Sequence, residues 1–224
     1  MKKICLLILL FNFISCNQKN AMKPLANIPE KNVLPLKKIA GKEIFIRIFK
    51  EEDELEVWVK NDKKFILFKT YPICAWSGSL GPKLKEGDGQ SPEGFYFVKK
   101  SQLNPNSSYH LAFNIGYPNH YDQMMKRTGS FIMVHGGCAS IGCYAMTDPY
   151  IEEIYFLADE WLQQNNSFFR IHIFPFRMNK NNMKRHKEDK WYSFWRNLKQ
   201  GYDIFEQEKI PPNVTSADNK YTFN

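Results

Sequence analysis

At the centre of this 224-residue sequence stands Phe131-Ile-Met-Val-His135-Gly-Gly-Cys138-Ala-Ser140-Ile-Gly-Cys143-Tyr-Ala-Met146. The apolar residues 131–134 predict a short buried strand that ends at His135. Small residues then lead to the pair Gly142-Cys143. A thiol nucleophile needs a base within hydrogen-bond reach and backbone N–H groups that receive the oxyanion of an acyl intermediate. We therefore expect Cys143 to be a nucleophile, His135 its base, and the amides of Gly142 and Cys143 an oxyanion hole.

The same residues allow three other interpretations. His135, Cys138 and Cys143 could bind zinc, although the pattern lacks a clear fourth ligand and a regular C-x-x-C spacing. A disulfide between Cys138 and Cys143 would close a very short loop and consume the nucleophile, whereas a pair between Cys74 and Cys138 would leave Cys143 free. His135 and Cys143 could also be packed residues, since cysteine is commonly buried. The residues alone leave these alternatives open.

The N-terminus has the pattern of a secretion signal. Two lysines precede an apolar run, residues 4–14, that is shorter than the roughly 20 residues of a membrane-spanning helix. Cys16 follows Phe13-Ile14-Ser15, which resembles the lipobox of bacterial lipoproteins, although Phe13 is a less usual residue there. An ordinary signal peptide with an incidental cysteine is the alternative. We expect removal of residues 1–15, lipidation of Cys16 and a membrane anchor that faces the periplasm.

The composition is that of a globular protein, because 43% of the residues are hydrophobic and 15% are aromatic. Its length allows one main domain with extensions. The formal net charge is +8, and without Lys2 and Lys3 it is +6. This charge could favour anionic wall polymers or lipid headgroups but encodes no specificity. The basic residues form no dense cluster within a nucleic-acid motif, so we expect no nucleic-acid partner.

Hydrophobic patterns predict a strand-rich domain between residues 40 and 178. Alternation places strands at 43–49, 55–59, 63–71, 95–98, 111–115 and 168–174, and the first three form an antiparallel meander. Asp148 as N-cap and Pro149 as first helical residue begin an amphipathic helix that ends near residue 164. The long glycine-rich loop at 76–94 is expected to be functional.

Both flanks of this domain are expected to be extensions. Residues 16–39 contain three prolines and no apolar periodicity, which predicts a lipidated cysteine and a tether. In the extension 179–224, aromatic residues between 191 and 205 predict a second amphipathic helix that packs on the domain. Gly201 is expected to bend or break this helix, and the tail from Pro211 to be loosely ordered.

Several motifs in order resemble one known family. His135-Gly136 followed by Ser140-Ile-Gly142-Cys143 is similar to the active-site signature of the L,D-transpeptidase (YkuD-type) catalytic domain, in which His-Gly precedes Ser/Thr-x-Gly-Cys. Most members carry a second histidine before this Gly-Cys pair and an arginine soon after it; this chain does not, and its gap between histidine and cysteine is shorter. These departures resemble the YafK-like branch. Further matching segments extend from about residue 40 onward, and they include Gly87-Asp-Gly-Gln-Ser-Pro-Glu-Gly94, Gly116-Tyr-Pro-Asn119, Arg127-Thr-Gly129 and residues 172–178.

The resemblance implies a β-rich α+β fold of mostly antiparallel strands and a site without metal or organic cofactor. Cys143 would attack a diaminopimelate carbonyl in a peptidoglycan stem peptide and form a thioester. His135 would act as general base and then as acid, and the carbonyl of Gly136 would orient its imidazole. Residues expected to contact substrate are Tyr117, Asn119, Arg127 and Ser140, with the loop 78–94 and His120 as further parts of the cleft wall.

The acceptor of the acyl group stays open. An amine acceptor would give transpeptidation, whereas water would give hydrolysis, and the YafK-like branch is associated with release of a wall-bound lipoprotein from peptidoglycan. A non-catalytic, peptidoglycan-binding lipoprotein that keeps the fold is the alternative from another class. We expect a monomer that acts in the bacterial cell envelope.

Overall fold

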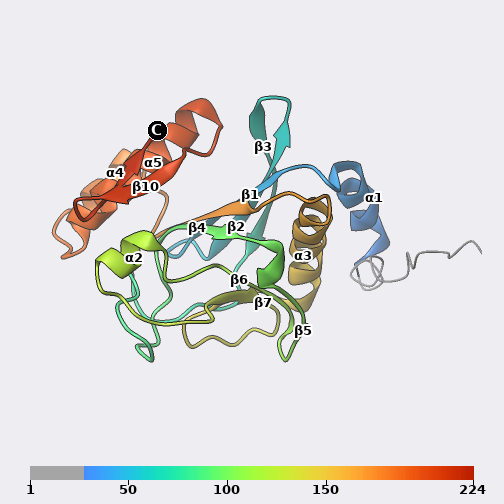
Figure 1. Cartoon of the computed structure of the whole chain (residues 1–224), viewed down its shortest axis with the longest axis horizontal. Helices are drawn as coiled ribbons and strands as arrows, with labels where there is room; N and C mark the ends of the chain where they lie inside the picture. Colours follow the sequence, from blue (N-terminus) through green and yellow to red (C-terminus); the bar gives the residue numbers. More distant parts are fainter. Residues whose placement is uncertain (1–27) are drawn as a thin grey trace, which may run out of the picture.

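Five strands form the main sheet of this computed structural model, which describes residues 28–224 (Figure 1). Their order across the sheet is β3-β2-β1-β9-β4. β1 runs parallel to β9, and the other neighbours are antiparallel. The strands are β1 (Ile44–Phe49), β2 (Glu54–Asn61), β3 (Lys64–Pro72), β4 (Gly94–Val98) and β9 (Phe169–Phe174).

The main sheet is covered on both faces, which explains why every residue of β1 is buried. Successive side chains of a strand point to opposite faces. Ile44, Ile46 and Ile48 belong to the large core of the domain. On the other face, Phe45 packs against Phe205 of the C-terminal helix α5 (Tyr192–Glu208), with ring centroids 4.7 Å apart. The predicted docking of this helix on the sheet is therefore confirmed.

A second sheet carries the stretch around His135. Its order is β5-β6-β7-β8, and its strands are β5 (Leu103–Ser107), β6 (His110–Asn114), β7 (Met133–His135) and β8 (Tyr144–Ala145). Helix α3 (Asp148–Leu162) contacts β1 of the main sheet and both β6 and β7 of this one. Its buried side chains, among them Ile151 and Ile154, share one core with both sheets. The site strands therefore rest on a rigid layer.

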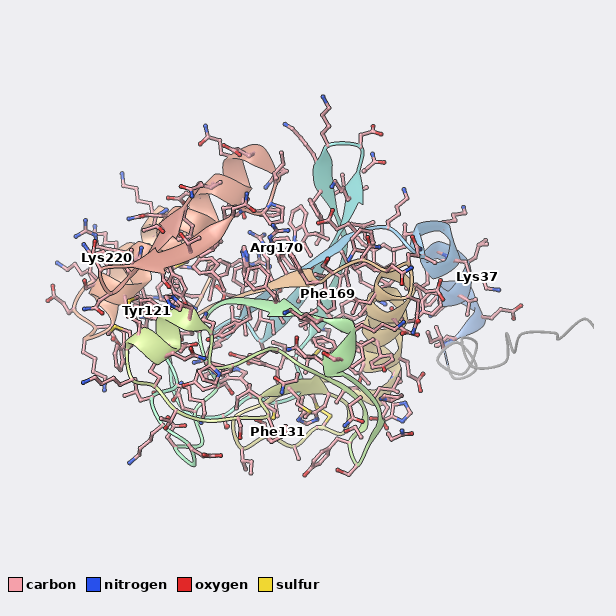
Figure 2. The ribbon with its side chains drawn as sticks, in the orientation of Figure 1. Lys37, Tyr121, Phe131, Phe169, Arg170 and Lys220 are labelled. Carbon is pink, nitrogen blue, oxygen red and sulfur yellow. A yellow bond between two sulfur atoms is a disulfide. The ribbon has the colours of Figure 1, made fainter. Side chains whose placement is uncertain are left out.

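The remaining elements lie at the ends and in the connections. They are α1 (Glu30–Ile39), the 3-10 helix at Lys100–Gln102, α2 (His120–Met124), α4 (Lys180–Arg185), β10 (Val214–Ala217) and β11 (Lys220–Phe223). Figure 1 shows α1 beside α3, while α4, α5 and β10 lie together at the opposite end of the molecule. Figure 2 shows how side chains such as that of Phe169 fill the interior between these layers.

The predicted strands and both amphipathic helices are confirmed, but four local predictions were wrong. The predicted tether contains helix α1, in which Leu36 is fully buried and Asn32 donates a hydrogen bond to Glu153 of α3. Asp148 is the first residue of α3 rather than its N-cap, which is Thr147. The tail after Pro211 forms the hairpin β10–β11.

Gly201 does not bend α5, contrary to the prediction. The helix continues through it, and a Cβ atom at this position would lie 2.5 Å from the Phe223 ring and 2.8 Å from the Phe95 ring. Glycine here permits a close approach between α5 and the strands beneath it. The predicted fold class, a strand-rich α+β domain with few helices, is confirmed.

Residues 1–27, which include the predicted signal and Cys16, lie outside the described part of the chain. Across residues 28–224, no helix has the length and apolar character that a membrane crossing requires.

Candidate active site

A cleft of about 760 Å³ opens beside the second sheet. His135, Ser140 and Cys143 all line it, so the structure brings together three residues predicted from the sequence. Phe131 lies at its rim and is 72% exposed, and Figure 2 shows this residue at the edge of the molecule. The neighbouring Ile141 is 90% exposed. The cleft therefore has an apolar rim around a polar centre.

The parallel pairing of β7 and β8 brings His135 and Cys143 to one place. Val134 lies opposite Tyr144 and His135 opposite Ala145, so that Cys143, which precedes β8, lies next to Met133. Met133 and His135 are two residues apart and therefore point to the same face of the sheet. The imidazole and the thiol thus share the cleft face, although ten peptide bonds of loop and strand lie between Met133 and Cys143.

The Cys143 thiol is half-buried and is not part of a disulfide. It accepts a hydrogen bond from the Met133 amide, with 3.4 Å between N and Sγ, and its Sγ lies 3.8 Å from the Phe131 carbonyl oxygen. Burial raises the pKa of the Cys143 thiol, and the Met133 amide and the charge of Lys83 oppose this only in part. The resting nucleophile is therefore a neutral thiol that needs a base.

The imidazole of His135 is held in one orientation. Its Nδ1 lies 2.5 Å from the carbonyl oxygen of Gly136, which can only accept a hydrogen bond, so that Nδ1 carries the proton. In the neutral ring, Nε2 is then the nitrogen that can take up a proton. The ring is 4% exposed and packs against the Tyr109 ring with centroids 4.9 Å apart. This tautomer suits a general base.

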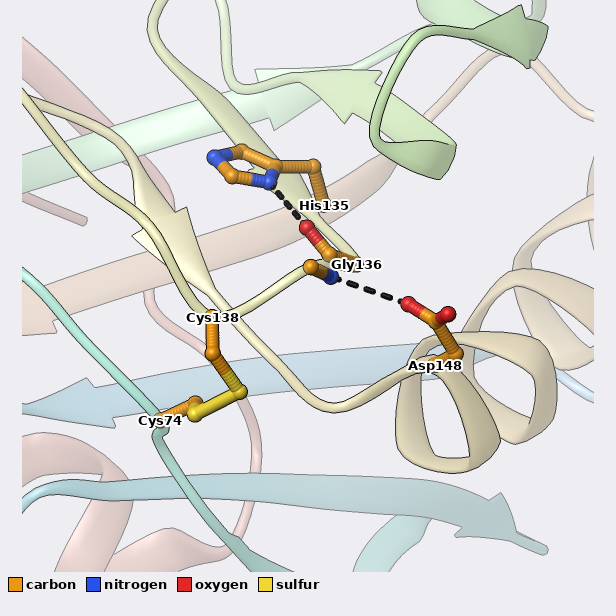
Figure 3. The surroundings of a disulfide bond; sticks show 6 residues. Cys74, His135, Gly136, Cys138 and Asp148 are labelled. Carbon is orange, nitrogen blue, oxygen red and sulfur yellow. Dashed lines mark hydrogen bonds between the residues drawn. A yellow bond between two sulfur atoms is a disulfide. The ribbon is translucent and has the colours of Figure 1, made fainter.

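Two contacts hold the loop that carries the Gly136 carbonyl (Figure 3). The Gly137 amide donates to Oδ1 of Asp148 at 2.9 Å, and Cys138 forms a disulfide with Cys74. A Cβ atom on Gly136 would lie 2.5 Å from Asp148 Oδ1 and 3.0 Å from the Tyr109 carbonyl, so the loop closes this tightly only around glycine. Of the cysteine alternatives, the structure has the Cys74–Cys138 pair.

Ser140 holds the backbone next to the nucleophile. Its hydroxyl donates to the Cys143 carbonyl at 2.7 Å and accepts from the Gly142 amide at 3.2 Å. Gly142 has a φ of +137°, a conformation that strongly favours glycine. The Gly142 amide, predicted as an oxyanion donor, is therefore bonded to Ser140 in this structure and would have to exchange that bond for the substrate.

Three residues predicted to contact substrate lie outside the lining of the cleft. Tyr117 is buried, and its hydroxyl donates to the Lys83 carbonyl. The Asn119 side chain accepts from the Asp122 amide and so caps helix α2. Arg127 forms a buried ion pair with Asp122 at 2.8 Å. In this structure, these polar groups satisfy one another around α2 rather than facing the cleft.

Lys83, Glu86 and Tyr109 also line the cleft, although no sequence motif marks them as site residues. Lys83 and Glu86 belong to the glycine-rich loop that was predicted as cleft wall, and this part of the prediction is confirmed. His120 lies elsewhere, with its Nδ1 2.6 Å from the Ser216 hydroxyl. The length of the loop was a signal, but nothing in its composition showed which side chains turn inward.

Cys138 forms the disulfide and therefore cannot serve as one of the three zinc ligands of the alternative interpretation. Within residues 28–224, no group of three or more His, Cys, Asp or Glu side chains is placed to hold a metal ion.

The solved structures that match this chain include the following two. The helical cell shape determining protein Pgp2 (K307A mutant) from Campylobacter jejuni matches with a TM-score of 0.48 and 20% identity over 80% of this chain and 66% of that chain. Bd1075 of Bdellovibrio bacteriovorus matches with a TM-score of 0.42 and 17% identity over 82% of this chain and 85% of that chain.

Sequence comparison gives stronger matches. The protein named "Putative L,D-transpeptidase YafK" of Escherichia coli (strain K12) is 46% identical over 183 residues, which cover 82% of this chain and 74% of that protein. The model of the L,D-transpeptidase catalytic domain, YkuD, matches residues 43–163, which include both His135 and Cys143. The family resemblance predicted from the motifs is thus confirmed, and the chain belongs to the YkuD family of L,D-transpeptidase catalytic domains.

Proposed function

We propose that this protein is a cysteine-dependent L,D-transpeptidase that acts on peptidoglycan stem peptides through a thioester. One observation carries the proposal: the free thiol of Cys143, just before β8, and the oriented imidazole of His135, at the end of the neighbouring β7, line the same cleft. A thiol and an imidazole on one cleft face supply the nucleophile and the base that acyl transfer by a cysteine requires.

In the first step, Nε2 of His135 takes the thiol proton while Sγ of Cys143 attacks the carbonyl carbon of a diaminopimelate residue. The resulting oxyanion is received by backbone amides near Cys143. His135 then gives its proton to the leaving amine, the C–N bond breaks, and a thioester remains on Sγ. The Gly136 carbonyl keeps the imidazolium in position because it accepts from Nδ1 throughout.

In the second step, a nucleophile attacks the thioester and Cys143 regains its proton. An amine acceptor forms a new peptide cross-link, whereas water releases a free carboxylate. The same residues would then serve as an amidase that detaches a wall-bound lipoprotein, which is the alternative function. The non-catalytic, peptidoglycan-binding lipoprotein is the alternative from another class, and it is disfavoured by the free thiol inside the cleft.

The proposal includes an exported monomer anchored at Cys16, because a peptidoglycan substrate lies outside the cytoplasmic membrane. Residues 1–15 would direct export and residues 16–39 would link the anchor to the domain. A Cys16→Ser variant should then appear in the soluble envelope fraction, and its retention in membranes would contradict the anchor.

Mass spectrometry of the protein after incubation with a stem tetrapeptide tests the mechanism. Wild type should gain the mass of the peptide minus its terminal amino acid, whereas Cys143→Ala should gain none and lose turnover by about a thousandfold or more. Cys143→Ser keeps the size of the side chain and serves as the matched control for folding. Turnover by Cys143→Ala would overturn the assignment of the nucleophile. Products from wall sacculi, new cross-links or released peptides and protein, distinguish the two acceptors.

A further inference from the structure

One wall of the catalytic cleft carries a buried cation, Lys83. The residue is 3% exposed and lines the cleft together with Cys143. Its Nζ donates to Oδ1 of Asp88 at 2.6 Å and to the Lys85 carbonyl at 3.0 Å. An ammonium group has three donors. One donor of Lys83 therefore has no hydrogen-bond partner among residues 28–224.

The loop around Lys83 is built to hold this ammonium in place. Asp88 also accepts hydrogen bonds from the amides of Leu84, Lys85 and Gln90 at 2.9 to 3.0 Å. Partial burial opposes ionisation of Asp88, but the bonds from Lys83 and these amides outweigh it and lower the pKa of its carboxyl to about 2. Asp88 is thus ionised near neutral pH, with its carboxylate 2.6 Å from the Lys83 Nζ.

A carboxylate, Glu86, faces the same cleft three residues further along the loop. Its Oε1 accepts from the Ser130 hydroxyl at 3.2 Å, and its amide donates to the Thr128 hydroxyl at 3.2 Å. These contacts fold the loop tip toward Ser130, which also lines the cleft. The cleft is therefore lined by a cation and an anion that lie three residues apart on one short loop.

We propose that Lys83 and Glu86 form a subsite for a zwitterionic amino-acid end, in which Lys83 binds the carboxylate and Glu86 the neighbouring ammonium. This inference rests on the proposed function, because diaminopimelate in the acyl donor has such a free end beyond the carbonyl that Cys143 attacks. A charge-assisted hydrogen bond is about twice as strong as a neutral one, and the burial of Lys83 limits screening by water. The subsite would therefore select stems with a free carboxylate over stems in which it is an amide.

The alternative is that Lys83 only neutralises Asp88 and keeps the loop folded. A structural role of this kind predicts that replacement of Lys83 slows the reaction equally for every substrate. A subsite predicts a change in the ratio between substrates. The ratio of acylation rates for the acid and the carboxamide form of one stem peptide therefore separates the two roles.

Acylation of wild type should be about 10- to 100-fold faster with the free acid than with the carboxamide, which corresponds to one hydrogen bond to a charged group. Lys83→Met should reduce this ratio to about threefold or less, and Lys83→Arg should restore most of it. Lys85→Met is the matched control, since this exposed side chain on the same loop does not line the cleft. Glu86→Gln should lower the preference for a free over an acetylated amine. Equal acylation rates for the free acid and the carboxamide in wild type would overturn the subsite. This comparison uses the wild-type protein alone and does not depend on whether a variant folds.

Binding to Cys143→Ala separates this inference from the proposed function. Isothermal titration with the two peptides needs no chemistry, and the acid should bind at least about tenfold more tightly. If wild type forms no acyl-enzyme but this preference persists, the proposed function fails and the subsite stands. If acylation occurs and neither rate nor affinity distinguishes the peptides, the subsite alone fails. The subsite could instead bind the acceptor. If the preference for the free acid appears only when the zwitterionic peptide is offered as the acceptor amine, the assignment of the subsite to the acyl donor is overturned.

Discussion

Replacement of both Cys74 and Cys138 by serine should destabilise the protein by about 4 kcal/mol. The disulfide joins residues 64 positions apart. In the chain-entropy description, a closed loop of this size removes about 14 cal/mol/K from the unfolded chain, which is about 4 kcal/mol at 25 °C. For a domain of this length, a loss of that size lowers Tm by roughly 8 to 16 °C.

Urea denaturation of wild type and of the double variant, each with and without a thiol reductant, measures this effect. The reductant should shift the midpoint of wild type toward that of the double variant and should leave the double variant unchanged. A difference below about 1 kcal/mol between the two proteins would refute the entropic reasoning. An equal effect of the reductant on both proteins would show that it does not act through this disulfide.

The same variant also tests the loop that orients His135. Cys138 follows the Gly136 carbonyl by two residues, and the Gly137 amide is held by Asp148 (Figure 3). Loss of one of these two anchors should slow acylation by about tenfold, since small displacements of a catalytic group reduce rates strongly. Unchanged acylation in the folded double variant would mean that the Asp148 contact is sufficient.

Three further perturbations test other parts of the structure. Gly136→Ala places a Cβ atom 2.5 Å from Asp148 Oδ1, so we expect a loss of about 1 to 3 kcal/mol in unfolding free energy and slower acylation; an unchanged rate would contradict the role of this carbonyl. Arg127→Met leaves the buried Asp122 carboxylate unpaired and should cost about 3 to 5 kcal/mol, while KM of the protein that remains folded stays as in wild type. Burial, with Arg170 and Arg47 nearby, lowers the pKa of His172 well below its usual value, so below about pH 6.5 the unfolded chain binds a proton that the folded protein does not. Between pH 7.5 and 5.5, wild type should therefore lose about 1 kcal/mol more stability than His172→Phe in urea titrations, and equal losses would refute this assignment.

Much of the fold was predictable because burial imposes a period on the sequence. The alternation of Ile44, Ile46 and Ile48 places β1, and the recurrence of apolar residues every three to four positions places α3 and α5. Helix α1 was missed because it contains Pro35 and buries little more than Leu36, which is too few residues for a visible period. The hairpin β10–β11 was missed for a similar reason, since each strand has only four residues.

The sequence by itself determined the chemical groups of the site. Acyl transfer by a thiol requires a cysteine, a base and a closely packed backbone, and these requirements select Cys143, His135 and the glycines between them from a stretch of nine residues. These residues lie close together in the chain. Their order and spacing are therefore visible in one segment and match the signature of the family.

Which distant groups complete the site depends on how the chain packs. The tertiary structure pairs Cys138 with Cys74, turns Arg127 and Asn119 toward helix α2, and brings Lys83, sixty residues before Cys143, into the wall of the cleft. A polar side chain that faces a cleft and one that forms a buried ion pair stand in the same kind of local sequence, so the sequence around them does not tell the two apart. Their partners come from segments far away in the chain, and the packing of the two sheets around α3 determines which of those segments meet.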